Sequence, residues 1–447
     1  MSPVESSGST FKDTDIGPMP AEWEVVRLGD LFDIQQGKAL HRKHQQGISP
    51  YPFLRTSNVY WGKIDLSKVD EMDFSEAEVE KYSLQPNDLL VCEGGEIGRA
   101  ALWQKQLRTY CYQNHLHRLR IASEDVHPAF YMYWMQAAFL LLNVYVGVGV
   151  KTTIANLSRS RLSRFLLPKP PLPEQRRIAH VLSTIQQAIA AQEDIIAAAR
   201  ETKRSLMHRL FTYGPGAEPA PTKETEIGEI PEHWEVVRVD DVFEIKLGKM
   251  LSKAARRGIS PRLYLRNANV QWGYFDLDEV KEMDFAPDEM DVFRLRKDDI
   301  LVCEGGEIGR TAIWEEQLPE CYYQKALHRL RPKAPNILPK FFLYYMMLVF
   351  LIRQVSVVEG AKSTIAHLPV AKLRMVPVTL PPLGEQRQLV EQIGAVDSKI
   401  AAEEQRKAAL QALFQSMLHQ LMTGQVRVRE AARLEPIASL HNGEGQG

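Results

Sequence analysis

The sequence predicts an α+β protein in which two similar globular domains are joined by two long helices that pair as an antiparallel coiled coil with pseudo-twofold symmetry. Two observations lead to this fold class. The chain is a tandem repeat, and each repeat changes once from short strands and turns to a single long helical pattern. The 447 residues, 45% of them hydrophobic, are enough to bury more than one core.

The repeat is clearest in LLVCEGGEIGRAALW, which begins at Leu89 and returns at Ile300 as ILVCEGGEIGRTAIW with twelve of fifteen positions unchanged. The offset of 211 residues holds elsewhere without a gap: IGPMPAEWEVVRL meets IGEIPEHWEVVRV, KTTIANL meets KSTIAHL, and PPLPEQRRI meets PPLGEQRQL. Solenoid repeats are far shorter than this. We therefore expect a duplicated domain together with the helix that follows it.

The sequence pattern of the first repeat changes from strand-like to helical near Pro170. Before it, runs such as EWEVVRL, DLLVCE and CYQNHLHRLRI have the alternation and turn residues of strands. After it, one long helix is predicted from Glu174 to Leu210, because glycine disappears and Pro173 suits a first turn. The chain thus divides into a first domain (1–170), a first spacer helix (171–213), a second domain (214–381), a second spacer helix (382–425) and a tail (426–447).

Apolar residues recur in steps of three and four on both predicted helices, as in a coiled-coil seam. Four polar residues interrupt the seam and either set its register or are ordinary interior positions: Gln192, Lys203, Glu403 and Lys407. Because the first helix ends where the second domain begins, the second helix must run back toward the first domain to pack along it. About 35 helical residues at 1.5 Å each would separate the domains by roughly 50 Å.

The CEGGEIG motif that both repeats contain lacks the Gly-Lys-Ser/Thr ending of a phosphate loop, and Glu93 and Glu96 would repel a phosphate. A strand, a tight turn at Gly94 and Gly95, and a returning strand explain the glycines better. In that arrangement four side chains would face a core: Leu90, Val91, Ile97 and Leu102.

A long apolar stretch, Ala129 to Val150, raises the question of a membrane span. Its counterpart from Phe341 has only twelve apolar residues before Arg353, so we predict two buried helices and no membrane segment. The four cysteines have no zinc-binding spacing, and no signal peptide precedes them, so a reducing cytoplasm is expected. Cys92 and Cys303 lie in apolar strands and are expected in the core.

Positive charge is segregated along the chain. The net charge is −1, so any surface for nucleic acid must be local, and Ile34–Ile64 and Ile245–Phe275 contain no acidic residue. Cationic loops bind phosphates and place Arg, Lys, Asn or Gln against base edges, although ordinary solvated loops would also be basic. We predict contacts with double-stranded DNA by Lys38, Arg42, Lys43, Arg55, Asn58, Lys151, Thr152, Lys249, Lys253, Arg256, Arg257, Arg266, Asn269, Lys362 and Ser363.

Motifs for catalysis are missing from the sequence. It contains no Walker loop, zinc pattern, nucleophile elbow, dinucleotide-binding glycine motif or Asn/Asp-Pro-Pro-aromatic signature of amino-methyltransferases. No catalytic residue and no metal ligand is therefore predicted. His115, His117 and His328 alternate with strand residues and are expected to be structural or to face DNA.

These features together resemble the specificity subunit of type I restriction-modification enzymes. The resemblance lies in PPLPEQRRI and PPLGEQRQL before long helices, and in KTTIANL and KSTIAHL. It also lies in IGPMPAEWEVVRL and IGEIPEHWEVVRV near the start of each repeat, and in the layout of two repeats. It implies that each domain is a target-recognition domain for half of a split DNA site, and that the helices space these domains and bind two modification subunits. It further implies a chain without active site or cofactor. Partner modification subunits would methylate adenine with S-adenosylmethionine, and restriction subunits, a motor-nuclease, would use ATP and magnesium.

In one respect the sequence departs from the family pattern, because the two recognition domains are usually dissimilar and here they align throughout. Two similar recognition domains should read similar half-sites, so we predict a split DNA target that is nearly palindromic. Differences between half-sites would come from ALHRKHQQ against MLSKAARR and from YPFLRTSN against RLYLRNAN. Two other classes stay open, a self-sufficient DNA enzyme and a scaffold that binds protein. The tail from Arg427 to Leu434 would either finish the helix or pack beside the amino terminus.

Overall fold

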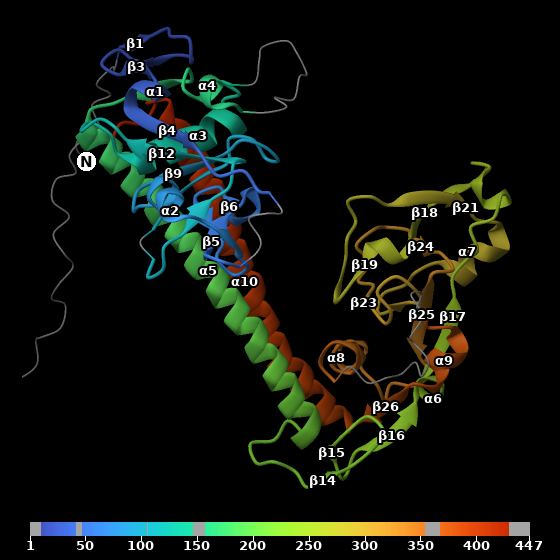
Figure 1. The fold of residues 1–447 in the computed structure, drawn as a ribbon. Helices are drawn as coiled ribbons and strands as arrows, with labels where there is room; N and C mark the ends of the chain where they lie inside the picture. Colours follow the sequence, from blue (N-terminus) through green and yellow to red (C-terminus); the bar gives the residue numbers. More distant parts are fainter. Residues whose placement is uncertain (1–9, 42–46, 105, 146–156, 354–366, 429–447) are drawn as a thin grey trace, which may run out of the picture. The chain divides into compact units, whose positions relative to one another are not determined.

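The computed structural model describes residues 10–41, 47–104, 106–145, 157–353 and 367–428. Contacts divide the chain into two compact units, one formed by Met1–Gln192 with Arg406–Gly447 and the other by Glu193–Gln405. The division falls inside both long helices, so each unit contains part of each (Figure 1).

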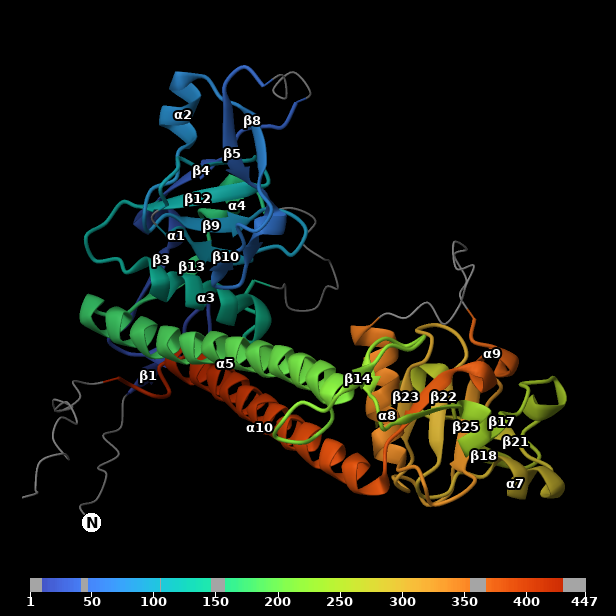
Figure 2. The same ribbon diagram turned by 90° about the horizontal axis from the view of Figure 1, so that it is seen from below.

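The centre of the first unit is an antiparallel sheet with the strand order β10-β9-β12-β4 (Figure 2). Leu119 pairs with Ile34 on one side and with Leu89 on the other, so these apolar residues share a face. The strands are β4 (Phe32–Gln36), β9 (Leu89–Cys92), β10 (Ala100–Leu102) and β12 (Leu116–Ile121).

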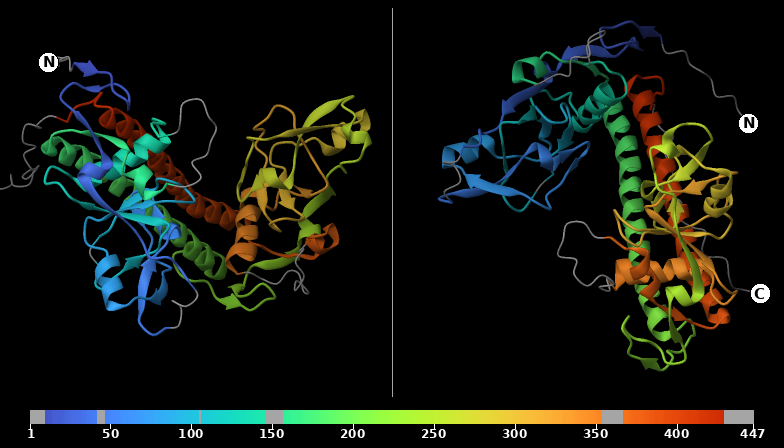
Figure 3. Two further views of the ribbon diagram at one scale, coloured as in Figure 1. Left: turned by 45° about the horizontal axis from the view of Figure 1, so that its top comes forward. Right: turned by 90° about the vertical axis from the view of Figure 1, so that its right-hand side faces the viewer.

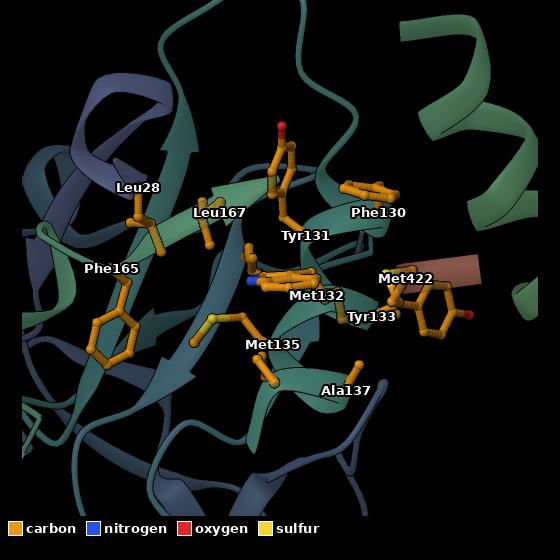
Figure 4. Close-up of a cluster of buried hydrophobic side chains, with 14 of the residues drawn as sticks. Leu28, Phe130, Tyr131, Met132, Tyr133, Met135, Ala137, Phe165, Leu167 and Met422 are labelled. Carbon is orange, nitrogen blue, oxygen red and sulfur yellow. The ribbon is translucent and has the colours of Figure 1, made fainter. Parts of the chain in front are cut away.

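Helix α3 (Pro128–Leu140) packs on that face and fills the main core of the unit (Figure 4). Pro128 stands at its first turn, where the missing N–H costs nothing, and Phe130 and Trp134 are fully buried. The helix predicted within Ala129–Val150 is therefore a core helix, and residues 146–150 lie outside the described part. None of the helices that the structure describes is long and apolar enough to span a membrane.

The opposite face of the sheet meets a second, smaller sheet with the order β11-β5-β8. Leu90 and Leu116 of the central sheet share a cluster with Leu54 and Tyr112 of the small sheet. Helix α2 begins after Ser75, whose hydroxyl accepts a hydrogen bond from the Glu78 N–H at 3.4 Å. These elements are β5 (Pro50–Leu54), β8 (Asp70–Asp73), α2 (Glu76–Tyr82) and β11 (Cys111–Tyr112).

The start of the first domain is joined to its end by strand pairing. Strand β3 (Glu24–Arg27) runs antiparallel to β13 (Leu166–Lys169), which leads directly into the long helix α5. The remaining elements are β1 (Phe11–Lys12), β2 (Met19–Pro20), α1 (Leu28–Leu31), the 3₁₀ turn η2 (Thr56–Asn58), β6 (Val59–Tyr60), β7 (Lys63–Ile64) and α4 (Arg159–Leu162).

Helices α5 (Leu172–Tyr213) and α10 (Leu383–Met422) pair antiparallel within each unit (Figure 3). In the second unit, Arg200 pairs with Glu404 at 2.6 Å and Lys203 pairs with Asp397 at 2.6 Å, so rising numbers on one helix meet falling numbers on the other. In the first unit, Ile178 and Leu182 share a core with Leu418 and Leu421.

The second unit repeats the first element by element at the 211-residue offset. Its central sheet has the order β17-β25-β22-β23 and its small sheet the order β21-β18-β24. The strands are β14 (Thr222–Lys223), β15 (Ile230–Pro231), β16 (Glu235–Arg238), β17 (Phe243–Leu247), β18 (Pro261–Leu265), β19 (Val270–Gln271), β20 (Tyr274–Phe275), β21 (Lys281–Asp284), β22 (Ile300–Cys303), β23 (Thr311–Ile313), β24 (Tyr322–Tyr323), β25 (Leu327–Pro332) and β26 (Pro377–Leu380).

The largest difference between the helices of the two units is at the helix that fills the core. The counterpart of α3 is the shorter α8 (Pro339–Met347), which continues as a π-helical turn, η5 (Leu348–Ile352). The other helical elements are α6 (Val239–Val242), η3 (Ala254–Arg256), η4 (Asn267–Asn269), α7 (Pro287–Phe293) and α9 (Val370–Met375). The predicted fold class, with two similar α+β domains and two long antiparallel helices, is confirmed.

Candidate nucleic-acid interface

The CEGGEIG motif of the first unit forms the tight turn between β9 and β10, as predicted. Gly95 has a φ of +75°, a left-handed conformation that favours glycine, and space around Gly94 and Gly95 is open. At the base of the turn Glu93 is only 5% exposed, and its Oε2 accepts a hydrogen bond from Gln36 Nε2 at 2.8 Å. The turn is therefore fixed at its base and exposed at its tip.

A buried histidine in each unit anchors the last residue of the KTTIANL and KSTIAHL segments. His117 Nε2 lies 2.7 Å from the Leu157 carbonyl oxygen, and His328 Nε2 lies 2.9 Å from that of Leu368. Because a carbonyl only accepts, the N–H must be on Nε2. Burial lowers the pKa of both histidines, which keeps the rings neutral. Their role is structural.

The 3₁₀ turns η2 and η4 are each held by the asparagine that ends them. Asn58 Oδ1 accepts a hydrogen bond from the Arg55 N–H at 2.9 Å, and its Nδ2 donates to the carbonyls of Asp65 and Lys68. Asn269 makes the same bonds in the second unit. Both asparagines were predicted to contact DNA, but they are buried and their amides hold the turn from inside.

Of the predicted DNA contacts, Lys38 is buried and Lys249 is half-buried in its own unit. Lys38 Nζ donates to Glu78 Oε2 at 2.8 Å and to the Asp73 carbonyl at 2.6 Å, and it lies over the Phe74 ring. This hydrogen bond lowers the pKa of Glu78. Lys249 pairs with Glu289 in the same way. The two lysines join the small sheet to helices α2 and α7.

Arg55 and Arg266 are half-buried, and each pairs with a carboxylate that is more exposed than itself. Arg55 Nη1 lies 3.0 Å from Asp70 Oδ2, and Arg266 Nη2 lies 3.1 Å from Glu279 Oε2. Glu279 is 72% exposed, and an ion pair of this kind contributes little stability. An incoming phosphate could replace such a carboxylate at small cost.

Three other predicted contacts, Lys253, Arg256 and Arg257, are exposed in and beside η3. The structure therefore does not bring all predicted residues together on one surface; it separates exposed cations from buried, turn-holding groups. The last six predicted contacts lie outside the described residues: Arg42, Lys43, Lys151, Thr152, Lys362 and Ser363.

Sequence reasoning missed a basic surface on and just after α4, formed by Arg159, Arg161 and Arg164. All three are exposed, and none has an acidic partner among the residues that the structure describes. In the counterpart α9, by contrast, Arg374 lies 3.4 Å from Asp240. The signal was present in the run SRSRLSR, which holds three arginines in seven positions without an acid.

Chemistry other than binding finds little support in the described residues. They contain no group of three or more His, Cys, Asp or Glu side chains placed to hold a metal ion. All four cysteines are buried thiols, and burial raises the pKa of Cys92 and Cys303 to about 11 and that of Cys111 and Cys321 to about 12. Such thiols are poor nucleophiles, and Cys92 and Cys303 are core residues as predicted.

The fold and the site together define a tandem-repeat binding protein, with two like α+β domains that expose basic side chains from a rigid frame. The particular family follows from comparison with known proteins. The model of the type I restriction modification DNA specificity domain matches twice, at residues 20–200 and 231–412, and the chain belongs to this family. The resemblance inferred from the sequence is confirmed. Subunits of this family are not catalytic, so the self-sufficient enzyme is excluded.

Relatives and solved structures agree with this assignment. The chain is 26% identical over 434 residues to the type I restriction enzyme MjaVIII specificity subunit of Methanocaldococcus jannaschii, covering 94% of this chain and 96% of the relative. A solved chain of a type I R-M system, described for its complex assembly and conformational transition, has a TM-score of 0.60 at 18% identity and covers 91% of this chain and 99% of its own length. The S subunit from M. genitalium has a TM-score of 0.51 at 18% identity, covering 90% and 96%.

Proposed function

We propose that this chain reads a split, nearly palindromic DNA target and directs type I adenine methylation and restriction to it. One observation carries the proposal: both units build the same frame at a constant offset of 211 residues, from the Gly-Gly turn to the asparagine-held 3₁₀ turn and the buried histidine. Sequence is read by side chains that a frame holds in a groove, so like frames should read like half-sites. The antiparallel helices support an inverted orientation of the two halves.

Duplex DNA is the partner that the charge distribution favours. The acid-free segments of both units expose cations, Lys63 in the first unit and Lys253, Arg256 and Arg257 in the second, which suit phosphates. Lys38, Lys249, Asn58 and Asn269 would then act on DNA by holding the loops, and Arg55 and Arg266 by exchanging a carboxylate for a phosphate. Arg42, Lys43, Lys151, Thr152, Lys362 and Ser363 complete the proposed contacts.

The remaining parts of the proposal concern partners and segments. Two modification subunits would dock on spacer helices 171–213 and 382–425, which also set the distance between half-sites, while residues 1–170 and 214–381 recognise DNA and 426–447 form a tail. S-adenosylmethionine would belong to the modification subunits, and ATP with magnesium to the restriction subunits. The assembly would work in the cytoplasm.

The test is single-molecule sequencing of genomic adenine methylation in the native host, with and without this gene. The same host should carry a rescue copy of the full chain, and expression of the partner subunits must be demonstrated. We expect a split motif with nearly inverted halves that disappears on deletion and returns with the rescue copy. The target would be methylated on both strands.

Two other results would change the proposal in different ways. A lost motif with unrelated halves would keep the specificity role and refute the argument from like frames. No lost motif, in a strain that expresses the partners, would favour a scaffold whose domains bind protein. Salt-dependent, sequence-specific binding of the purified assembly to duplex DNA would exclude that scaffold.

A further inference from the structure

The CEGGEIGR motif ends in an arginine that reaches from the Gly-Gly turn to the 3₁₀ turn. Arg99 Nη2 donates to the Thr56 carbonyl at 2.6 Å, and Arg310 Nη2 donates to the Asn267 carbonyl at 2.7 Å. The two side chains are only 12% and 14% exposed. Thr56 and Asn267 are the first residues of η2 and η4, so each turn is held at its start by the motif and at its end by its own asparagine.

The same arginine also orients a side chain that differs between the units. The guanidinium of Arg99 lies over the ring of Tyr60, 5.1 Å from its centroid. At the equivalent position, Arg310 Nη1 donates to Gln271 Oε1 at 3.2 Å. One arginine thus holds an aromatic ring by a cation–π contact in the first unit and an amide by a hydrogen bond in the second.

The arginines are not optimised for stability alone. Nε of Arg99 and Nε of Arg310 are both buried with no hydrogen-bond partner among the described residues, which costs free energy in each unit. Within the described residues, the same donor is left without a partner in both repeats, so the two units share this feature. Fixing a backbone while leaving its outer side chains exposed is how a rigid reading element is built.

Around η2 and η4, some equivalent positions carry the same residue in both units and others do not. The positions that hold the turn are the same in both units: Asn58 and Asn269, Gly62 and Gly273, Arg99 and Arg310. Five positions of residues 55–64 differ from residues 266–275, and all are exposed or half-buried. Three of them lie on the 3₁₀ turn or just after it: Thr56 against Asn267, Ser57 against Ala268, and Tyr60 against Gln271. The side chain of Tyr60 is 45% exposed.

We infer that these three positions in each unit are base-reading positions, and that Arg99 and Arg310 are the positioning residues that aim them. The inference rests on the proposed function and names where its specificity lies. Asn267 and Gln271 carry amides, which pair bidentately with adenine in the major groove. Gln271 already donates to the Ala268 carbonyl, but it keeps a second N–H and a second lone pair. Thr56, Ser57 and Tyr60 offer hydroxyls and an aromatic face, so the half-sites should differ at the bases beneath them.

The test exchanges the three side chains in the full chain and reads the target. T56N/S57A/Y60Q makes the outer face of η2 identical to that of η4, and the reciprocal variant is N267T/A268S/Q271Y. Each is assembled with its partner subunits, and the methylated motif is determined by sequencing. We expect the first variant to change one or two bases of one half-site toward the other half, and the reciprocal variant to do the opposite. A matched control, A77D/E80D on α2, also makes exposed positions like those of the second unit and should leave the motif unchanged.

Arg99→Gln separates positioning from folding. Without the arginine that positions them, the base-reading side chains should discriminate the target from a one-base mismatch roughly tenfold less well or worse. Non-specific DNA binding and its salt dependence should stay as in the parent chain. Equal loss of specific and non-specific binding would show a merely structural role and overturn the assignment. An unchanged motif in both exchange variants, with a parent chain that confers a motif, would overturn the inference and leave the proposed function intact. A parent chain that confers no motif overturns both.

Discussion

The two units dock equivalent helices onto the long helices by different chemistry. In the first unit, the Tyr133 hydroxyl of α3 donates to Gln186 Oε1 at 2.8 Å, and Phe414 packs against the tyrosine ring. In the second unit, the Tyr344 hydroxyl of α8 donates to Asp397 Oδ2 at 2.7 Å, and Lys203, which occupies the place of Phe414, pairs with that carboxylate. A neutral junction in one unit is an ionic junction in the other.

A second junction shows the same exchange. Glu174 accepts from Trp23 Nε1 at 3.1 Å and from Arg427 Nε at 2.6 Å, whereas Glu385 accepts from Trp234 Nε1 at 2.8 Å and from His233 Nε2 at 2.8 Å. The aromatic anchors are kept and their polar partners are replaced. The difference teaches that the fold demands a satisfied hydrogen bond at a fixed place and tolerates any chemistry that supplies it.

The largest expected effect comes from the most buried of these groups. Glu174→Ala should destabilise the β3–β13 region of the first unit by about 2–4 kcal/mol, because Trp23 Nε1 loses its acceptor and Arg427 keeps only the more exposed Glu22. Glu385→Ala, at a side chain 26% exposed, should cost the second unit only about 1–2 kcal/mol. Local opening free energies from hydrogen exchange of β3 and β16 amides measure both. Equal losses in the two units would contradict the comparison.

A smaller difference is expected at the tyrosine junctions. Asp397→Ala should weaken the docking of α8 by about 2 kcal/mol, because it leaves the Lys203 ammonium and the Tyr344 hydroxyl without their acceptor. Gln186→Ala removes one neutral hydrogen bond and should cost α3 about 1 kcal/mol. Hydrogen exchange of α8 and α3 amides gives the two values. The double variant Lys203→Phe/Asp397→Gln, which copies the first unit, should recover most of the loss; no recovery would argue against the exchange of equivalent junctions.

The basic surface at α4 should make the first unit contribute more to the salt dependence of DNA binding than the second. Replacing Arg159, Arg161 and Arg164 by glutamine should lower the slope of log affinity against log salt by up to about 2.7, since each phosphate contact contributes about 0.9. Lys372→Gln/Arg374→Gln in α9 is the matched control, and it should change the slope less because Arg374 is already paired with Asp240. Titrations of the purified assembly with duplex DNA at several salt concentrations measure both. Identical slopes in all three proteins would rule out phosphate contact at α4.

The smallest effect should be the same in both units, because it involves a feature they share. Burial lowers the pKa of His117 and His328, so the unfolded chain binds more protons than the native one below about the ordinary value of 6.5. Stability is therefore full above that pH and falls as acid approaches the lowered pKa. Protonation would also place a hydrogen on Nδ1, which is buried without an acceptor in the described residues.

Urea unfolding between pH 7.5 and 5.5 tests this. His117→Gln and His328→Gln keep an amide N–H in reach of the carbonyl and cannot titrate. Each variant should lose part of the acid dependence, and the two losses should be alike. A double variant, His117→Gln/His328→Gln, is the control. If its free energy of unfolding falls with acid as much as that of the parent chain, other groups cause the dependence.

Much of this molecule could be predicted from its sequence, because the duplication tests each assignment twice. The β9–β10 turn, the core helix at Phe130 and the long helix predicted from Glu174 all follow from local spacing and are confirmed, although the long helix begins two residues earlier, at Leu172. Individual side chains were harder to place. Asn58 and Lys38 lie in basic, acid-free sequence, yet their partners Lys68 and Glu78 come later in the chain and meet them only through the pairing of β5 with β8.

The tail shows the same limit. Sequence reasoning left two possibilities for Arg427, and the structure selects the second: α10 ends at Met422, and the Arg427 guanidinium meets Glu22 at 2.5 Å and lies over the ring of Trp23. No local pattern announces this contact, because Gly216 stands at the equivalent place in the other repeat. Residues 429–434 lie outside the described part.

The way the units divide the chain has a consequence for synthesis. The second unit is continuous, from Glu193 to Gln405, whereas the core of the first unit also contains Phe414, Leu418, Leu421 and Met422. Domains fold as their residues leave the ribosome. The first domain to be translated is therefore the last to be finished: it must wait, with the apolar side of Ile178 and Leu182 uncovered, until the whole second unit has been made and the end of α10 arrives to cover it.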